Sequence, residues 1–414
     1  VIKWLHLNES FMLGPEKDWS QPLNNAVVNG HLDVVKWLNE NRPYERCHSQ
    51  MMIEAAQHGH FEIIKWLNEN RRVEMLPLLD EKLYTFKSII DHLAMHGNLD
   101  IIKWLYQNGY NIWTGKALFD AASNGHFEMV KWLYSLDPSM KKDIHSIDGA
   151  AKSGNLEMVQ WLHQKGAKNN CSTNAMDWAA ENGHLEIVKW LYINRTEGCT
   201  PDAIDRAARS GHLDIIKWFN TTYNDLIDEF PTIHESKSKN KSRKSKSKQI
   251  SKSKQIFFAN SQKINKCSRK AMDHAATNGY FEIVKWLHEN RTEGCSIDAM
   301  NGAAKNGHLE IVKWLHENRT EGCTIDAMNW AARNGHLEIV KWLHENRNEG
   351  CTQQAIDDAV ISRHYDVVEW LCKNRTELGC NDIDSGRAPL EIVQLLYKSR
   401  RNAQRKILQQ YNNF

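Results

Sequence analysis

The chain has 414 residues, too many for one compact core and enough for two or three globular domains or one elongated array. Its composition is ordinary, 41% apolar and 25% charged, and no apolar run approaches the roughly 18 residues of a membrane span. The formal charge of +2 hides an asymmetry, because nine bases and no acid lie between Lys237 and Lys254. The remainder holds 44 bases against 51 acids, which argues against nucleic-acid binding by the folded part.

The first residues, from Val1 to Leu5, do not read as a secretory signal. Val1 is not methionine and falls within a helical pattern, so we expect the protein to extend upstream of it. The nine cysteines indicate a reducing, intracellular compartment. We expect a cytoplasmic protein, with nuclear entry through the basic tract as the alternative.

An internal repeat governs the whole chain, and its clearest copy reads GHLEIVKWL at residues 335–343. After the basic tract its tryptophan recurs every 28 residues. A degenerate copy follows at residues 390–396. The tryptophans of this phrase are Trp4, Trp37, Trp66, Trp104, Trp132, Trp161, Trp190, Trp218, Trp286, Trp314, Trp342 and Trp370.

Each repeat is predicted to form two short antiparallel helices. In the clearest copy Thr324 is a good N-cap, and Asp326 suits the first turn of the helix dipole. Gly335 ends that first helix, and a second helix is expected over residues 337–346. This second helix has too many apolar positions for a helix exposed on one side, so it must lie between its partner and the next repeat. We therefore expect the tryptophans of the repeated phrase to be core residues.

These elements predict an all-α helical-repeat solenoid with shortened turns between repeats. In chain order, residues 1–220 form a first array whose first repeat is incomplete, and residues 221–266 form an insertion. The insertion contains a Lys/Ser tract at residues 236–254 that cannot bury apolar surface and is expected to be disordered. Residues 267–398 form a second array, and residues 399–414 a C-terminal tail. We expect the two arrays to stack continuously, because no capping repeat is visible at Trp218 and Phe219.

The pattern AAxNGHLEIVKxL resembles the second half of the ankyrin repeat over nearly the whole chain. It is similar to the short ankyrin arrays of giant DNA viruses of amoebae. Two departures stand out: the period is 28 instead of about 33, and Asp or Asn replaces the family's first-helix histidine. The resemblance implies that these side chains accept hydrogen bonds between repeats. They stand at positions 24, 91, 148, 177, 205, 273, 301, 329 and 357.

Two ladders of potential metal ligands recur at the repeat spacing. The cysteines are Cys171, Cys199, Cys267, Cys295, Cys323, Cys351 and Cys380, and the histidines are His31, His60, His126, His184, His212, His308 and His336. Side chains one repeat apart lie about 8–10 Å from one another, too far for a shared metal or a disulfide. We interpret the cysteines as small buried side chains that pack beside the turns, and the histidines as residues at the start of the second helix that contact the backbone. We expect no metal and no cofactor.

Two slots on the first helix vary from repeat to repeat, in contrast to the constant Ala-Ala pair beside them. They lie just before the pair and three residues later, and therefore line one helix face. We call this face the variable strip. The resemblance places it in the concave groove of an ankyrin array. Its candidate partner-binding residues are His92, Asp120, Trp178, Arg206, Arg209, His274, Trp330 and Arg333.

The variable strip predicts a scaffold that binds an intracellular protein, a host protein if the viral resemblance holds, because Trp and Arg dominate binding hot spots. In one alternative the variable strip is a solvent-exposed face that binds nothing. In the other the array itself is inert, and its basic tract serves nuclear import or the binding of nucleic acid or another polyanion. We predict no enzyme, because every candidate acid or base recurs at a repeat position whereas a catalytic centre is singular. We expect a monomer.

Overall fold

The computed structural model describes residues 20–41, 49–75, 90–109, 115–136, 145–165, 171–229, 267–375 and 389–411. Within these ranges the secondary structure is helical and contains no β-strand. The fold is thus the predicted all-α repeat array. It divides into two compact units, residues 1–172 and 173–414. The Lys/Ser tract at 236–254 and Cys380 lie outside the described residues.

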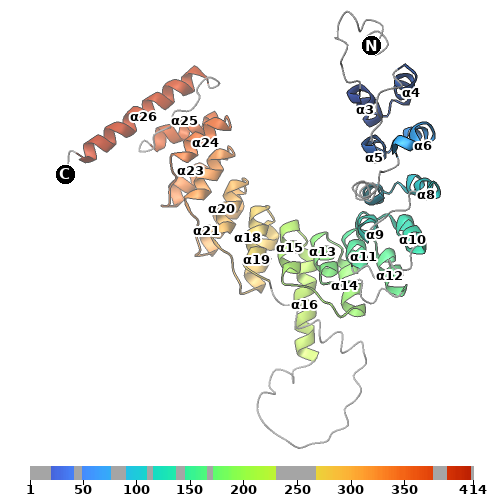
Figure 1. Cartoon of the computed structure of the whole chain (residues 1–414). Helices are drawn as coiled ribbons and strands as arrows, with labels where there is room; N and C mark the ends of the chain where they lie inside the picture. The colour runs from blue at the N-terminus through green and yellow to red at the C-terminus, as the bar shows by residue number, and fades with distance from the viewer. Residues whose placement is uncertain are drawn as a thin grey trace, which may run out of the picture. The chain divides into compact units, whose positions relative to one another are not determined.

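In the first unit, first and second helices alternate along the chain (Figure 1). Residues 90–96 are also helical and precede α8 as the first helix of their repeat. The other helices are α3 (Ser20–Val28), α4 (Leu32–Asn41), α5 (Ser49–Gln57), α6 (Phe61–Met75), α8 (Leu99–Gln107), α9 (Gly115–Ser123), α10 (Phe127–Leu136), α11 (Ser146–Lys152) and α12 (Leu156–Gln164).

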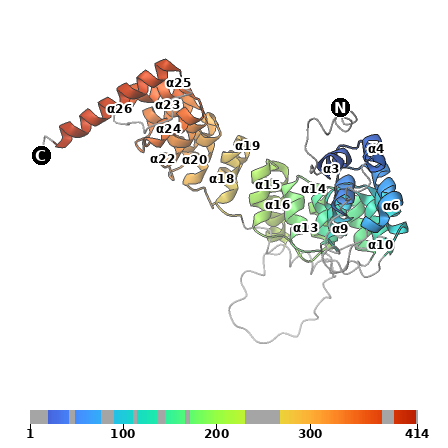
Figure 2. The same cartoon turned by 45° about the horizontal axis from the view of Figure 1, so that its top comes forward.

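The second unit repeats the same helix pair and ends in one longer helix. Its first helices are α13 (Asn174–Glu181), α15 (Asp202–Ser210), α18 (Lys270–Thr277), α20 (Ile297–Lys305), α22 (Ile325–Arg333) and α24 (Gln354–Ile361). Its second helices are α14 (Leu185–Asn194), α16 (Leu213–Glu229), α19 (Phe281–Asn290), α21 (Leu309–Asn318), α23 (Leu337–Asn346) and α25 (Tyr365–Asn374). The last helix is α26 (Leu390–Tyr411). Consecutive first helices pack side by side, as α18, α20 and α22 do in Figure 2.

The local signals in the clearest repeat act as expected. The side chain of Thr324 accepts a hydrogen bond from the backbone N–H of Asp326 and so caps α22. Gly335 follows that helix with a φ of 78°, a left-handed conformation that glycine adopts without steric cost. The second helix of the repeat spans Leu337–Asn346, the range that its sequence predicts.

The core is formed by the constant positions of the repeat. Ala331 and Ala332 of the first helix are fully buried, and Ile339, Val340 and Leu343 of the second are at most 2% exposed. Between the first and the last described repeat the equivalent residues are buried, whereas Val34 in the first and Ile392 and Val393 in the last are half-buried. Each repeat therefore contributes one thin layer of core that its neighbours complete.

The Asp or Asn slot joins consecutive first helices by hydrogen bonds, as the resemblance implies. The carboxylate of Asp177 accepts hydrogen bonds from the backbone N–H of Thr200 at 2.8 Å and from its hydroxyl at 2.7 Å. Asn329 accepts from the backbone N–H of Thr352 at 3.0 Å and donates to that hydroxyl at 3.0 Å. The same pairing recurs at Asp148, Asp205, Asp273 and Asn301.

The repeat contacts continue across the insertion. Ser268 donates hydrogen bonds from its backbone N–H and its hydroxyl to Asp205, at 2.9 and 2.5 Å. Helix α18 packs against α15, and the ring of Tyr280 lies over Gly211. The repeat at 267–294 thus occupies the place that the next repeat would take without an insertion.

The tryptophans of the repeated phrase are predicted from their helical position to be core residues, and this prediction is wrong. Those in the described residues are half-buried. The ring of each of six of them packs edge-on against a Tyr or His two residues after the tryptophan of the preceding repeat, at 5.0–5.8 Å between ring centroids. The indoles therefore lie at the joint between second helices, and the smaller Ile, Val and Leu side chains fill the core.

Two predicted boundaries lie inside helices. Helix α16 continues to Glu229, nine residues past the predicted end of the first array at 220, because no Gly or Pro interrupts residues 221–229. Helix α26 runs unbroken from Leu390 to Tyr411 and packs against α25, so the predicted start of the tail at 399 falls in mid-helix. The last repeat and the tail thus share one helix.

Candidate protein-binding surface

The two units each carry a part of the variable strip. His92 and Asp120 belong to the first unit, and Trp178, Arg206, Arg209, His274, Trp330 and Arg333 to the second. The side chains at the strip are more exposed than the Ala-Ala pair next to them, because one helix face cannot point both to the core and to solvent. Arg209 and Arg333 are exposed, whereas His92, Trp178, Arg206, His274 and Trp330 are half-buried.

In the first unit the strip residues are engaged with close neighbours. The imidazole rings of His92 and His96 lie 4.4 Å apart. Burial and the neighbouring His96 lower the pKa of His92, which favours the neutral ring. Asp120 is only 9% exposed and receives an ion pair at 2.7 Å from Lys116 of the same helix. Asp120 is therefore less accessible to a partner than the sequence suggests.

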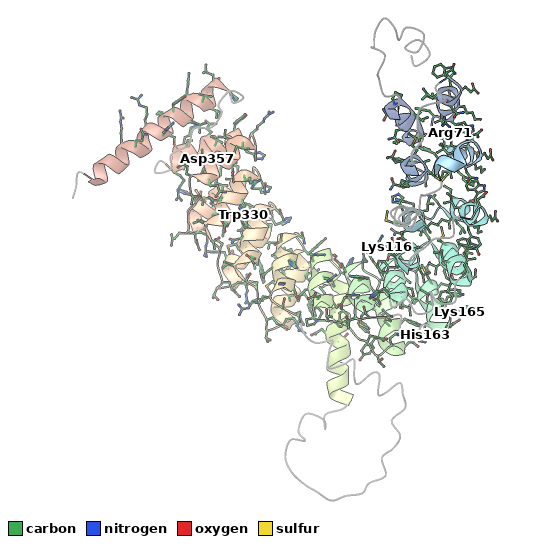
Figure 3. The ribbon with its side chains drawn as sticks, in the orientation of Figure 1. Arg71, Lys116, His163, Lys165, Trp330 and Asp357 are labelled. Carbon is green, nitrogen blue, oxygen red and sulfur yellow. The ribbon has the colours of Figure 1, made fainter. Side chains whose placement is uncertain are left out.

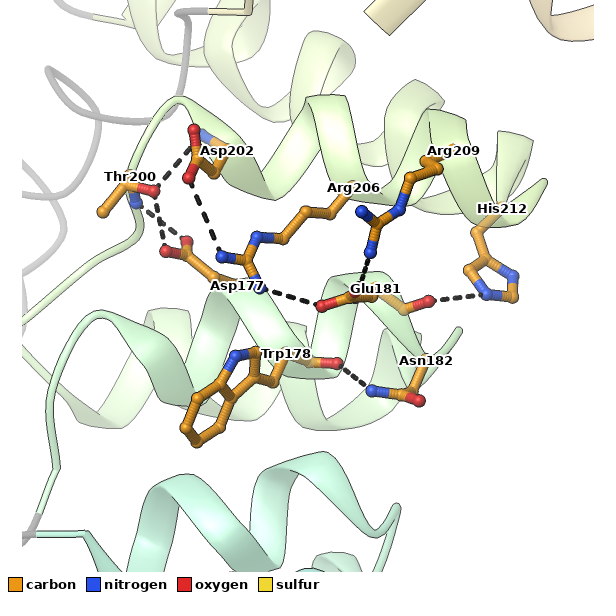
Figure 4. Close-up of polar contacts among 9 residues, drawn as sticks. All are labelled: Asp177, Trp178, Glu181, Asn182, Thr200, Asp202, Arg206, Arg209 and His212. Carbon is orange, nitrogen blue, oxygen red and sulfur yellow. Dashed lines mark hydrogen bonds and ion pairs between the residues drawn. The ribbon is translucent and has the colours of Figure 1, made fainter. Parts of the chain in front are cut away.

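In the second unit the two arginines of α15 converge on one carboxylate (Figure 4). Arg206 donates to Glu181 of α13 at 2.9 Å and lies 3.8 Å from Asp202. Arg209 binds the other oxygen of Glu181. The sequence predicts both arginines as anchors, but both are already ion-paired to Glu181 of the strip. Glu181 and Arg209 stand 28 residues apart, at the same slot of neighbouring repeats, and this spacing could have revealed the pair.

The two strip tryptophans come from equivalent positions of α13 and α22, four repeats apart. Both are half-buried, so one part of each indole remains open to solvent. Figure 3 labels Trp330 among the side chains of the second unit. The ammonium group of Lys305 lies 5.5 Å from the centroid of the Trp330 ring. Trp330 is thus an aromatic surface with a cation beside it.

His274 occupies the same slot of α18. Its Nδ1 is buried without a hydrogen-bond partner among the described residues. Burial raises the pKa of both Asp205 and Asp273 above the ordinary value of a carboxyl, and the neighbouring His274 ring offsets only a small part of that rise.

The histidine ladder contacts backbone, as predicted, and its contacts run between repeats. The Nε2 of His60, His126, His212 and His336 lies 2.9–3.1 Å from a carbonyl oxygen of the preceding repeat. Each ring also lies over the glycine that ends the preceding first helix. Neutral rings with a proton on Nε2 satisfy this geometry.

The cysteine ladder is packed at the turns. Cys199, Cys295, Cys323 and Cys351 are buried, Cys171 and Cys267 are half-buried, and none of them forms a disulfide. Burial raises the pKa of Cys295 to about 12, so its thiol is a poor nucleophile at neutral pH. In the described part of the chain, no three His, Cys, Asp or Glu side chains are placed to hold a metal ion. No described helix is both long and apolar enough to cross a membrane.

Comparison with known proteins identifies the repeat. A family model described as "Ankyrin repeats (many copies)" matches residues 23–67, 90–134, 147–192 and 176–219. A second, described as "Ankyrin repeats (3 copies)", matches residues 300–382. Together these matches cover more than half of the chain. No curated protein matches it.

Proposed function

Because the chain belongs to the ankyrin-repeat family, whose members are generally protein-interaction modules, we propose that it is a scaffold that binds a protein partner through the variable strip. The observation that carries the proposal is Trp330, a half-buried indole on a first-helix face whose other side is sealed by the buried Ala331 and Ala332. A large apolar ring that contributes little to the core is best explained by a contact outside the chain.

Trp178 supports the proposal independently, because it takes the same slot in a distant repeat. Glu181, Arg206 and Arg209 next to it form an ion-paired polar cluster of the kind found at the rim of interfaces. We further propose an intracellular partner, since the described cysteines form no disulfide, and a host protein as that partner if the chain shares the source of the viral arrays that it resembles.

Affinity capture from a cell extract tests the proposal. The substitutions Trp178→Ala and Trp330→Ala together are expected to reduce capture of the partner at least about tenfold, because hot-spot aromatic residues contribute on the order of 2 kcal/mol. Helix content and thermal midpoint should stay near those of the wild type. The control variant Glu310→Ala with Glu338→Ala alters exposed second-helix positions and should capture normally. Equal capture by all three proteins would rule out the strip.

A further inference from the structure

A row of side chains follows the C-terminal ends of four consecutive first helices, one repeat apart. It consists of Thr277, Lys305, Arg333 and Ile361, the residues that end α18, α20, α22 and α24. Lys305 and Arg333 are exposed, and Ile361 is 72% exposed, the highest value among the large apolar side chains of the described residues. Two bases and one open apolar side chain therefore follow one another along this face, and Lys305 also lies 5.5 Å from the Trp330 ring.

Lys305 and Arg333 lack the ion pairs that the second-helix lysines of this region form. On the second helices each lysine of the repeated phrase in this region pairs with the glutamate three residues before it, as Lys313 does with Glu310 and Lys341 with Glu338. At the equivalent slot of α15, Arg209 pairs with Glu181. Lys305 and Arg333 form no ion pair with a described residue, and the ammonium group of Lys305 rests near the Trp330 ring instead.

From this arrangement we infer that Lys305, Arg333, Trp330 and Ile361 form a docking site for an acidic peptide segment that also carries an apolar side chain. The inference rests on the proposed function and names the chemistry of the partner. Carboxylates of the segment pair with the two bases, and its apolar side chain packs on Trp330 or Ile361. Charge complementarity of this kind directs a partner to its site and sets its orientation.

The repeat geometry sets the spacing of the segment. Neighbouring first helices lie about 10 Å apart, and an extended peptide advances about 3.3 Å per residue. Carboxylates about three residues apart in an extended segment therefore match Lys305 and Arg333. The segment runs along the stacking direction, across α20, α22 and α24.

A nucleic acid fits the same surface less well. Helices α20 and α22 carry Asp298 and Asp326 in their first turns, so a continuous phosphate backbone that crossed these helices would meet acids as well as bases. The chain outside residues 237–254 has more acids than bases, whereas folded domains that bind nucleic acid are typically basic. An isolated pair of bases beside aromatic and aliphatic surface suits a peptide with few charges.

Selection from a phage-displayed library of random dodecamer peptides tests this inference with the full chain. Peptides retained by the wild type should be enriched in Asp and Glu about three residues apart, with an aromatic or aliphatic residue between or beside them. The variant Lys305→Glu with Arg333→Glu should lose these peptides at least about tenfold and favour basic ones instead. The control Lys313→Glu with Lys341→Glu changes the net charge equally on the second helices and should retain them.

Two outcomes separate failure of the inference from failure of the proposed function. The inference would be overturned if the selected peptides lacked acidic residues but still required Trp330. It would also be overturned if Lys305 and Arg333 retained a single-stranded oligonucleotide in preference to peptides. In either case the affinity capture would still decide whether the chain binds a protein. Peptides whose retention is unchanged by Trp330→Ala and by the double charge reversal would overturn both.

Discussion

Replacing Gly97 by alanine is expected to destabilise the first unit by about 3–4 kcal/mol, the sum of backbone strain and a steric clash, well beyond the cost of the same change at Gly125. Both glycines end a first helix with positive φ, 73° and 80°, so alanine at either site costs about 1–2 kcal/mol of backbone strain. At Gly97 the new Cβ would also lie 2.5 Å from Nδ1 of His126, whereas at Gly125 the nearest atom is 3.9 Å away.

The difference arises from the next repeat. His126 covers Gly97 and its Nε2 lies 3.0 Å from the carbonyl oxygen of Met95, so the ring cannot move without losing that hydrogen bond. The repeat after Gly125 has Asn155 in the histidine slot. Urea unfolding of the Gly97→Ala and Gly125→Ala variants measures how much unfolding free energy each substitution removes. The change His126→Ala in the Gly97→Ala background should recover most of the difference. Equal costs at the two glycines would contradict this contact between repeats.

Replacing Asp177 by asparagine is expected to stabilise the second unit by about 1–3 kcal/mol at neutral pH. Asp177 is 2% exposed, and burial raises its pKa to about 6 in spite of the hydrogen bonds from Thr200, which lower it. Asparagine avoids the buried charge. It is already used at the same slot by Asn301 and Asn329, where it makes the equivalent pair of hydrogen bonds.

The pH dependence identifies the cause of this stabilisation. A carboxyl whose pKa is higher in the folded than in the unfolded state stabilises the fold below about pH 4 and loses that contribution as the pH rises through about 6. The wild type and Asp177→Asn should therefore be similarly stable at pH 4 and diverge up to about pH 7. The reverse change Asn329→Asp should destabilise in the same pH window. A constant difference between pH 4 and pH 7 would show that ionisation of Asp177 is not the cause.

The sequence predicts the repeat unit closely and its surface less well. Thr324, Gly335 and residues 337–346 match their predicted roles because capping and helix termination depend on neighbours in the chain. The half-buried tryptophans could not be predicted from helical periodicity, since periodicity gives the face of a helix and not the depth at which the next repeat covers it.

Whether a charged residue of the strip is ion-paired depends on contacts between repeats. The pairing of Arg206 and Arg209 with Glu181 arises because α13 and α15 are neighbours, and only the comparison of equal slots one repeat apart anticipates it. The lack of ion pairs from Lys305 and Arg333 to described residues becomes visible only once the pairing of the other bases is known. Predicting a binding residue in a repeat array thus requires the residues one period before and after it.

Hydrogen exchange of the chain with and without its captured partner tests the central claim most directly. The claim is that the partner binds the variable strip on the first helices and does not contact the exposed face of the second helices. We expect added protection in α20 and α22, at residues 297–305 and 325–333, and little change in α21 and α23, at residues 309–318 and 337–346. Added protection confined to α21 and α23 would contradict it.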